Sequence, residues 1–243
     1  MNSKSAGEAA HSHMDRFPLI YRLATGLYKR IVFPLRGGIR AGGTERVPSE
    51  GGMILASVHM SSLDPPALAA TLKIRRLRAL AKEELWNNKL FGMIIEGIGA
   101  FPVKRGVGDM ESIRKCIAIL QGGEAVIVFP EGTRNDGVTM NPLHPGVAML
   151  AKRAGVPVVP AGISGTQKGG KGRVRVIYGE PVRYDEIVRG NEKEGRQIFL
   201  DELASRIQAL CREAGLELRS APANSPSPSP HDPETEPAAP PRA

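Results

Sequence analysis

The chain has 243 residues, a formal net charge of +8 and two cysteines, Cys116 and Cys211. This length fits one sizeable α/β domain with a helical appendage, and two widely separated cysteines exclude a disulfide framework or a cysteine-rich zinc site and favour a reducing compartment. The positive charge favours an anionic partner, and the scarcity of aromatic residues and lack of a nucleic-acid-binding motif favour a phosphorylated substrate or phospholipid surface over nucleic acid.

Composition divides the chain into four segments. The polar residues 1–13 predict a disordered leader, residues 14–37 an amphipathic membrane-interface helix, residues 38–218 an α/β domain and the proline-rich residues 219–243 a disordered tail. No segment reaches the roughly 18 apolar residues of a membrane span. We therefore expect any membrane contact to be peripheral, at the cytoplasmic face, and to favour anionic lipids.

The segment from residue 15 to residue 36 has helical periodicity, which Pro34 should kink or end. Leu19 and Leu23 fall outside its apolar stripe, which comprises Phe17, Ile20, Tyr21, Ala24, Leu27, Tyr28, Ile31 and Leu35. Basic residues recur on the opposite side, at Arg22, Lys29 and Arg36. Two interpretations stay open: a helix lying in the membrane interface, or one packed on the domain with a solvated charged face.

The rest of the domain alternates between short apolar runs and amphipathic segments. Strands are predicted at residues 38–42, 53–58, 77–81, 99–103, 125–129, 156–163 and 173–178. Helices are predicted at residues 65–72, 85–97, 110–121, 146–154 and 192–215. This alternation predicts an α/β fold with a mostly parallel central sheet flanked by helices.

One candidate catalytic pair follows the second predicted strand. His59 comes directly after the apolar run, and Asp64 precedes Pro65 at the start of the next helix. If the loop folds back, the carboxylate orients one ring nitrogen and leaves the other to take a proton from an alcohol. The alternative is a surface histidine beside an ordinary helix-capping aspartate.

A second polar segment follows the strand at 125–129. It supplies a glycine turn, a hydroxyl and a guanidinium, in Glu131, Gly132, Thr133 and Arg134. Arg134 can bind two phosphate oxygens at once, and local N–H groups can complete an anion site. Glu131 either orients Arg134 or accepts from a substrate hydroxyl; a structural ion pair between them is the alternative.

Four blocks, in order, resemble the lysophosphatidate (1-acyl-sn-glycerol-3-phosphate) acyltransferase family. They are the HxxxxD motif from His59 to Asp64, Gly-Ala-Phe-Pro-Val-Lys-Arg at 99–105, Phe-Pro-Glu-Gly-Thr-Arg at 129–134 and Val-Pro-Val-Val-Pro at 156–160. The resemblance spans about residues 38–181. It implies an α/β acyltransferase of phospholipid biosynthesis that forms phosphatidate.

The resemblance also implies roles for individual residues. His59 would be the general base and Asp64 its orienting partner, with Lys82 near the reacting centre and Pro160 shaping a strand end on the acyl-donor side. The glycerol-phosphate site would comprise Arg105, Glu131, Gly132, Thr133 and Arg134. Acyl-CoA or acyl-carrier protein would be the donor substrate, with neither a cofactor nor a metal.

Three positions depart from the family pattern: Val58, Lys104 and the pair His144-Pro145. They leave the acyl acceptor open between lysophosphatidate, a lyso-ornithine lipid and glycerol 3-phosphate, and an inactive peripheral lipid-binding protein is a further alternative. Apolar residues that line either the core or an acyl channel are Leu85, Leu90, Phe91, Ile94, Ile95 and Ile98.

Overall fold

The computed structural model describes residues 18–72, 74–103, 110–167, 169–170, 172–189 and 191–221. A seven-stranded sheet has the order β1-β8-β7-β2-β5-β3-β4. Its strands are β1 (Ile39–Gly42), β2 (Met53–Ser57), β3 (Leu77–Lys82), β4 (Ala100–Val103), β5 (Ala125–Val128), β7 (Val158–Ser164) and β8 (Val174–Tyr178). All neighbours run parallel except β7 and β8, so the mostly parallel sheet is confirmed.

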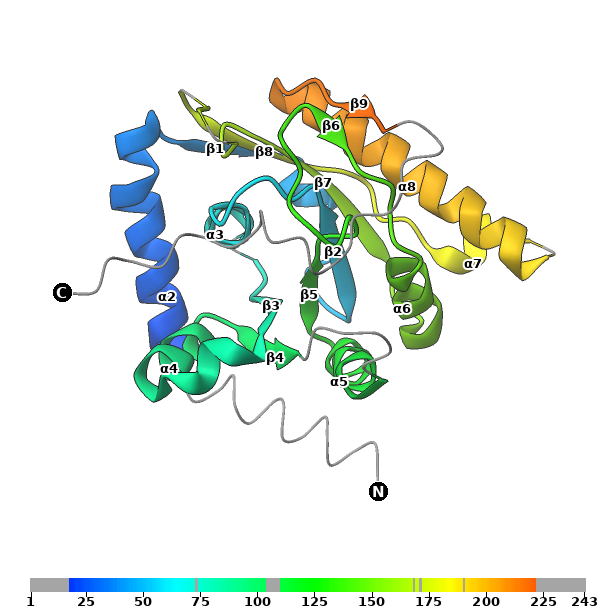
Figure 1. The fold of residues 1–243 in the computed structure, drawn as a ribbon, viewed down its shortest axis with the longest axis horizontal. Helices are drawn as coiled ribbons and strands as arrows, with labels where there is room; N and C mark the ends of the chain where they lie inside the picture. Colours follow the sequence, from blue (N-terminus) through cyan, green and yellow to red (C-terminus); the bar gives the residue numbers. More distant parts are fainter. Residues whose placement is uncertain are drawn as a thin grey trace.

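Helices cover both faces of the sheet (Figure 1). One layer holds α2 (Pro18–Leu27), α3 (Asp64–Thr71) and α4 (Lys89–Gly97); the other holds α5 (Met110–Gln121), α6 (Gly146–Ala154) and α8 (Glu192–Ala214). The chain moves outward from β2 to β4 and then back through β5 to β7. Because parallel crossovers are right-handed, that reversal places α3 and α4 opposite α5 and α6.

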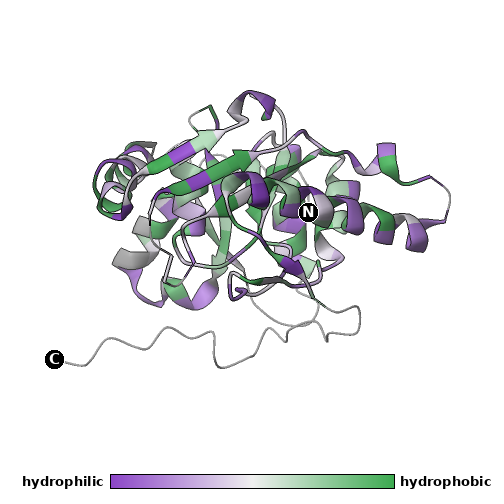
Figure 2. Ribbon diagram, turned by 90° about the horizontal axis from the view of Figure 1, so that it is seen from above, coloured by the Kyte–Doolittle hydropathy of each residue, from purple (hydrophilic) through white to green (hydrophobic). Residues whose placement is uncertain are grey.

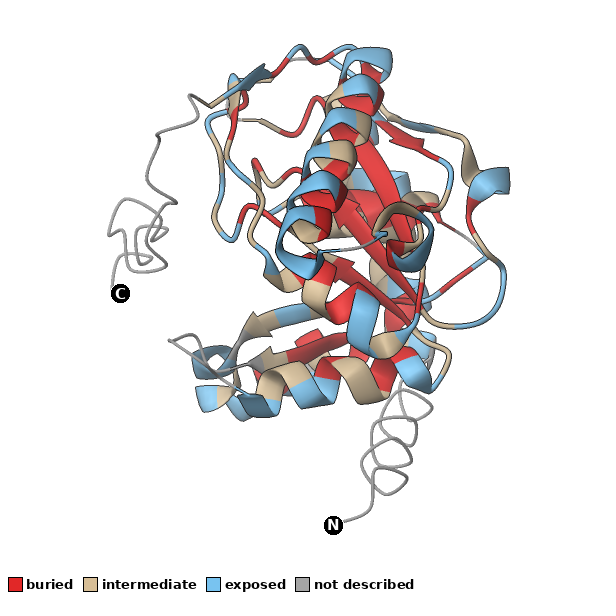
Figure 3. Ribbon diagram, turned by 90° about the vertical axis from the view of Figure 1, so that its right-hand side faces the viewer, coloured by how far each residue is buried: buried red, intermediate tan, exposed pale blue. Residues whose placement is uncertain are grey.

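The core lies between the sheet and these layers. Every residue of β2 and of β7 is buried, which is typical of central strands covered on both faces. Figure 2 shows hydrophobic residues in the central strands and hydrophilic residues along the surrounding helices, and Figure 3 shows the same centre as buried. The long helix α8 buries one side against β7 and β8 through Phe199, Leu203, Ile207, Leu210 and Cys211.

A close backbone contact seats α8 on the sheet. A Cβ added at Gly162 of β7 would overlap the backbone of Leu210 and Cys211. At the helix end, Ser164 donates from its hydroxyl to the carbonyl of Ala214 at 2.6 Å. The absence of a side chain at position 162 therefore lets the helix lie directly on the strand.

The N-terminal helical segment differs from the single stripe that the periodicity predicts. Helix α2 continues as a π-helical turn, η1 (Tyr28–Val32), and a 3-10 turn, η2 (Pro34–Arg36). Tyr21 is buried and accepts a hydrogen bond from the Leu77 amide, while Ile20 packs at Gly97. The segment therefore has two apolar faces: one on the domain, and an exposed one comprising Leu19, Leu23, Leu27, Ile31 and Leu35.

The predicted core helices agree closely with the structure, and α5 and α6 have the predicted bounds. The segment predicted as one helix at 85–97 is a 3-10 turn, η4 (Glu83–Asn87), followed by α4. Three short elements gave no periodic signal: β6 (Thr139–Met140), α7 (Tyr184–Ile187) and β9 (Arg219–Ser220); η3 (Thr44–Arg46) is equally short. Because β9 pairs with β6, the start of the predicted disordered tail at 219 is wrong by at least two residues.

Parts of three predicted segments fall outside the described residues. They are the leader at 1–13, residues 14–17 of the predicted N-terminal helix and the tail beyond residue 221. Within the part of the chain that the structure describes, no helix is both long and apolar enough to cross a bilayer.

Candidate functional site

Two loops meet at one end of the central sheet. Strands β2 and β5 are parallel neighbours, with Ala56 level with Val128, so the segments that follow them leave the sheet side by side. The amide of Asn135 donates to the carbonyl of His59 at 2.7 Å. This bond joins the loop carrying His59 and Asp64 to the loop carrying Glu131 and Arg134.

The predicted contact between His59 and Asp64 is present. His59 Nδ1 lies 2.9 Å from Asp64 Oδ2, and the carboxylate is fully buried. Asp64 is the first residue of α3, with Leu63 at the cap position, so its side chain does not cap the helix as the alternative interpretation required. Instead Oδ2 accepts from the backbone amides of Met60 at 2.6 Å and Ser61 at 2.7 Å.

These contacts decide the tautomer of His59. All three groups around Asp64 Oδ2 are nitrogens, and an oxygen that already accepts two amide N–H groups acts as an acceptor toward the ring. His59 Nδ1 therefore carries a hydrogen and donates it, which leaves Nε2 with a free lone pair. The ring also stacks on Phe129, with centroids 4.1 Å apart and 17° between the planes. Its side chain remains 18% exposed, so Nε2 is held in orientation at the surface.

Glu131 supports the His59 loop from inside the protein. Its side chain is fully buried, and Oε1 accepts from the His59 backbone amide at 3.1 Å. The same carboxylate accepts from the side-chain amide of Asn135 and from the backbone amide of Asn141. Burial raises the pKa of Glu131 to about 7, against the opposing effect of these hydrogen bonds. The expectation that Glu131 orients Arg134 or contacts substrate is thus replaced by a role inside the protein.

Gly132 makes the turn that exposes the rest of this loop. Its φ is +74°, and an added Cβ would lie 2.8 Å from the ring of His144. The amide of His144 donates to the carbonyl of Pro130 at 2.7 Å. Both the backbone conformation and the adjacent ring therefore require glycine here. His144, noted in the sequence as a departure from the family pattern, forms a wall of this turn.

The two residues after Gly132 lie at the surface. Thr133 is half-buried and Arg134 is exposed, and Arg134 has no hydrogen-bond or ion-pair partner among the described residues. An unpaired guanidinium beside a glycine turn is suited to binding an anionic ligand. Because Asn135 bonds the His59 carbonyl, this cation and the imidazole belong to the same end of the sheet.

The other predicted site residues are placed less completely. The backbone of Lys82 ends β3, at the same edge as His59, while Arg105 lies outside the described residues. Pro160 pairs with Ala56 in the interior of β7, so the expectation that it shapes a strand end is wrong. Among the acyl-channel candidates, Leu85 is 39% exposed and Ile95 is buried in the core.

Asn135 and Phe129 contribute to the site although no sequence pattern singles them out. Asn135 follows the conspicuous Phe-Pro-Glu-Gly-Thr-Arg block, and the Asn-Asp-Gly sequence at 135–137 is a turn signal that could have drawn attention to it. Phe129 ends the strand predicted at residues 125–129. Its contact with His59 depends on the pairing of β2 with β5, which a local sequence pattern does not give.

The chain is similar to known acyltransferases over most of its described length. The family model described as Acyltransferase matches residues 38–164. A 1-acyl-sn-glycerol-3-phosphate acyltransferase from Bacillus subtilis is 31% identical over 185 residues, covering 74% of this chain and 92% of the relative. One from Streptococcus pneumoniae is 28% identical and covers 80% of this chain and 74% of the relative.

Two further comparisons bear on acceptor and fold. A lyso-ornithine lipid O-acyltransferase from Pseudomonas aeruginosa is 32% identical over 152 residues, covering 62% of this chain and 56% of that protein. The crystal structure of the 1-acyl-sn-glycerophosphate (LPA) acyltransferase PlsC from Thermotoga maritima matches with a TM-score of 0.63 at 25% identity. That match covers 80% of this chain and 78% of the other.

Proposed function

The chain belongs to the acyltransferase family and is an O-acyltransferase, and we propose that it transfers a fatty acyl group to the sn-2 hydroxyl of 1-acyl-glycerol 3-phosphate, giving phosphatidate. The family resemblance predicted from the four sequence blocks is confirmed. The observation that supports this acceptor is that an oriented imidazole lies at the same end of the sheet as the exposed Arg134 guanidinium, which has no partner among the described residues. We propose acyl-CoA or acyl-carrier protein as the donor.

The oriented histidine supports a direct transfer. Nε2 of His59 takes the proton from the acceptor hydroxyl as the oxygen attacks the thioester carbonyl. A carbon–oxygen bond forms, the carbon–sulfur bond breaks, and the proton passes to the departing thiolate. Asp64 holds the ring and stabilises the imidazolium that forms during the step. Both cysteines are buried, which supports a mechanism without a cysteinyl intermediate.

The second loop supports recognition of the acceptor phosphate. Arg134 offers two N–H groups to phosphate oxygens, while the exposed backbone at Gly132 and the Thr133 hydroxyl complete an anion site. On the basis of the family resemblance, we also include Arg105 in the phosphate site and Lys82 near the reacting centre. Glu131 stays behind the loop as a positioning group, because its carboxylate already accepts from three neighbouring nitrogens.

A lyso-ornithine lipid is the second candidate acceptor. It is supported by the 32% identity to the Pseudomonas aeruginosa enzyme of that name. The unpaired Arg134 favours the phosphate-bearing acceptor, because a guanidinium matches the geometry of phosphate oxygens. The carboxylate of ornithine can also bind a guanidinium, but the positively charged amine of ornithine offsets its charge, whereas the phosphate carries a net negative charge.

An acceptor panel tests the proposed function. The purified chain is offered lysophosphatidate, lyso-ornithine lipid or glycerol 3-phosphate, each with acyl-CoA and with acyl-carrier protein, and products are identified by mass spectrometry. We expect phosphatidate from lysophosphatidate at a kcat/KM at least tenfold above that for the other acceptors. Faster acylation of lyso-ornithine lipid would show that lysophosphatidate is not the preferred acceptor and that lyso-ornithine lipid is. Acylation of none of them would favour the inactive lipid-binding alternative.

We further propose that the exposed face of the N-terminal segment lies on an anionic membrane surface at the cytoplasmic face. Its apolar residues are spaced four apart, and their exposed fractions are 64% at Leu19, 63% at Leu23, 50% at Leu27, 54% at Ile31 and 84% at Leu35. An apolar row of this length is costly in water and typical of interfacial helices. Arg22 and Arg30 are exposed on the same segment, which supports a preference for anionic lipids.

A further inference from the structure

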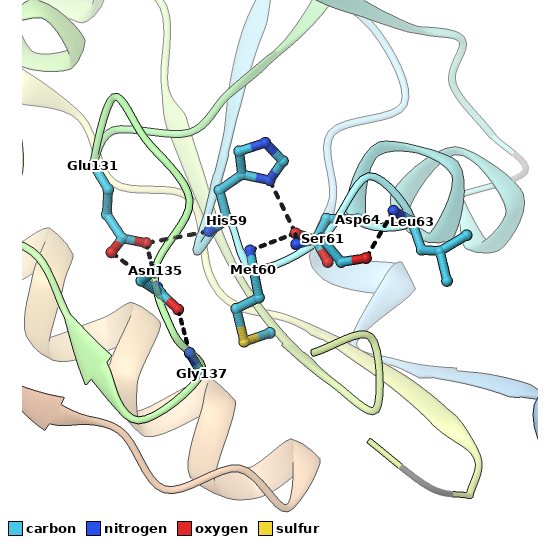
Figure 4. A network of polar contacts seen from close by, with 8 residues as sticks. All are labelled: His59, Met60, Ser61, Leu63, Asp64, Glu131, Asn135 and Gly137. Carbon is cyan, nitrogen blue, oxygen red and sulfur yellow. Dashed lines mark hydrogen bonds and ion pairs between the residues drawn. The ribbon is translucent and has the colours of Figure 1, made fainter. Parts of the chain in front are cut away.

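Asn135 makes three sets of polar contacts where the loop after β5 meets the loop after β2, and Figure 4 shows those of its side chain. Its backbone amide donates to the His59 carbonyl at 2.7 Å. Its side-chain nitrogen donates to both oxygens of Glu131, at 2.8 and 2.9 Å. Its side-chain oxygen accepts from the Gly137 amide at 2.9 Å. Each polar group of this side chain is therefore used within the site.

The same carboxylate of Glu131 holds the catalytic loop by its backbone. Glu131 Oε1 accepts from the His59 amide, 72 residues away in the chain. The order of contacts is thus Asn135 side chain, Glu131 carboxylate, His59 backbone and finally the His59 ring, whose Nδ1 is bonded to Asp64. Nothing in the family resemblance assigns a role to position 135.

We propose that Asn135 is a positioning residue for acyl transfer. Its side-chain amide keeps Glu131 an acceptor for the His59 backbone amide, and this bond fixes the general base beside the loop that carries Arg134. This inference rests on the proposed function of His59. Asn135 does not contact the reacting atoms; it acts through Glu131. Loss of its side chain should therefore lower kcat more than it raises the KM for the acceptor.

The electrostatic surroundings of Glu131 make this contact consequential near neutral pH. Burial and the nearby Asp64 carboxylate raise the pKa of Glu131, while the bonds from Asn135, Asn141 and His59 lower it. Cys211, on α8, is also close enough to interact with it electrostatically. Removing the Asn135 amide deletes a lowering effect, so Glu131 should hold its proton to higher pH. A protonated carboxyl has one fewer oxygen available as an acceptor, which weakens its hold on His59.

The test is Asn135→Ala, with kinetics and an independent spectroscopic measurement. We expect kcat at pH 7 to fall about ten- to hundredfold. The KM for lysophosphatidate should change less than about twofold, because the variant removes no group that binds the acceptor. As the pH rises from 7 toward 9, Glu131 ionises in the variant and kcat should recover toward that of the unaltered protein. The acid limb of the profile should thus move to higher pH.

Asn191→Ala is the matched control. Asn191 accepts from the amide two residues ahead, Lys193, at 3.0 Å, as Asn135 does from Gly137. Asn191 caps α8 and has no carboxylate partner among the described residues. We expect its variant to keep the kinetic profile of the unaltered protein despite losing the same kind of turn bond.

Glu131→Gln isolates the path of the effect. On that background Asn135→Ala should lower kcat by less than about twofold, because contacting residues that act through one another are non-additive. Histidine-selective nitrogen-15 labelling supplies the activity-independent readout. The His59 amide resonance should titrate with Glu131 near pH 7, lose that step in Glu131→Gln and shift it upward in Asn135→Ala.

The outcomes separate this inference from the proposed function. An upward shift of the His59 amide titration together with a kcat-selective loss supports it. If Asn135→Ala leaves both the titration and kcat unchanged, or if its effect on kcat is undiminished in Glu131→Gln, the inference is wrong while acyl transfer stands. An unaltered protein that acylates no acceptor overturns the proposed function and, with it, the catalytic part of the inference.

Discussion

Among single residues, the site separates groups that face solvent from groups that hold the loops. The His59 ring is partly exposed and Arg134 is exposed, whereas Asp64 and Glu131 are fully buried carboxylates. Burying a carboxylate is costly unless donors compensate it. Here the donors are the His59 ring, the loop backbone and the Asn135 side-chain amide, so the cost is offset by bonds that also orient the two loops.

Arg134→Ala should mainly raise the KM for lysophosphatidate. Loss of a charge-assisted contact of about 1.5–3 kcal/mol corresponds to roughly ten- to hundredfold in KM, with a smaller change in kcat. Steady-state kinetics over a range of acceptor concentrations checks this. The matched control is Arg153→Ala, since Arg153 is an exposed arginine in the last turn of α6, at the opposite end of the sheet. An unchanged acceptor KM in Arg134→Ala would place the phosphate elsewhere.

The predictability of each residue follows from the range of its contacts. The bond between His59 and Asp64 spans five residues and was predictable from the loop alone. Glu131 was misassigned because its partner, the His59 amide, is far away in the chain and adjacent only through the pairing of β2 with β5. The polarity of Glu131 suggested a substrate contact, and nothing local indicated that its side chain is buried.

Among the elements, the N-terminal segment has apolar residues on two faces, one packed on the domain and one exposed. In an α-helix, residues four apart drift by about 40° per step, so a row from Leu19 to Leu35 would wind around a straight helix. The π-helical turn at residues 28–32 rotates less per residue and offsets part of that drift. The predicted stripe has the periodicity of a uniform α-helix, and Leu19 and Leu23 therefore fall outside it.

The exposed row should govern binding to lipid vesicles. Leu23→Gln combined with Leu27→Gln should weaken binding to phosphatidylglycerol vesicles, measured by sedimentation, by about a hundredfold or more, because each buried leucine contributes about 1.5–3 kcal/mol. Added salt should weaken binding of the unaltered protein further. Ile198→Gln is the control, since Ile198 is an equally exposed apolar residue on α8. Unchanged binding of the double variant, or an equal loss in the control, would contradict a role for this row.

For the whole molecule, alternation of strands and helices was sufficient to predict the sheet but not its order. The reversal after β4, which brings β5 beside β2, joins the two loops of the site. Strand order depends on which strands, far apart in the sequence, pair with one another. A local hydrophobic pattern carries little information about that pairing. Short elements such as β6 and β9 are not predictable for a related reason. Two residues are too few to show a periodicity, and each of these strands is defined by its pairing with the other.

The most direct test of the account is the rate at which folded His59→Ala forms phosphatidate from lysophosphatidate. Removal of the only group proposed as general base should lower kcat by about 10²–10⁴-fold, with the acceptor KM and the thermal unfolding midpoint close to those of the unaltered protein. A folded His59→Ala protein that turns over at a near-normal rate would contradict general-base catalysis at this sheet edge.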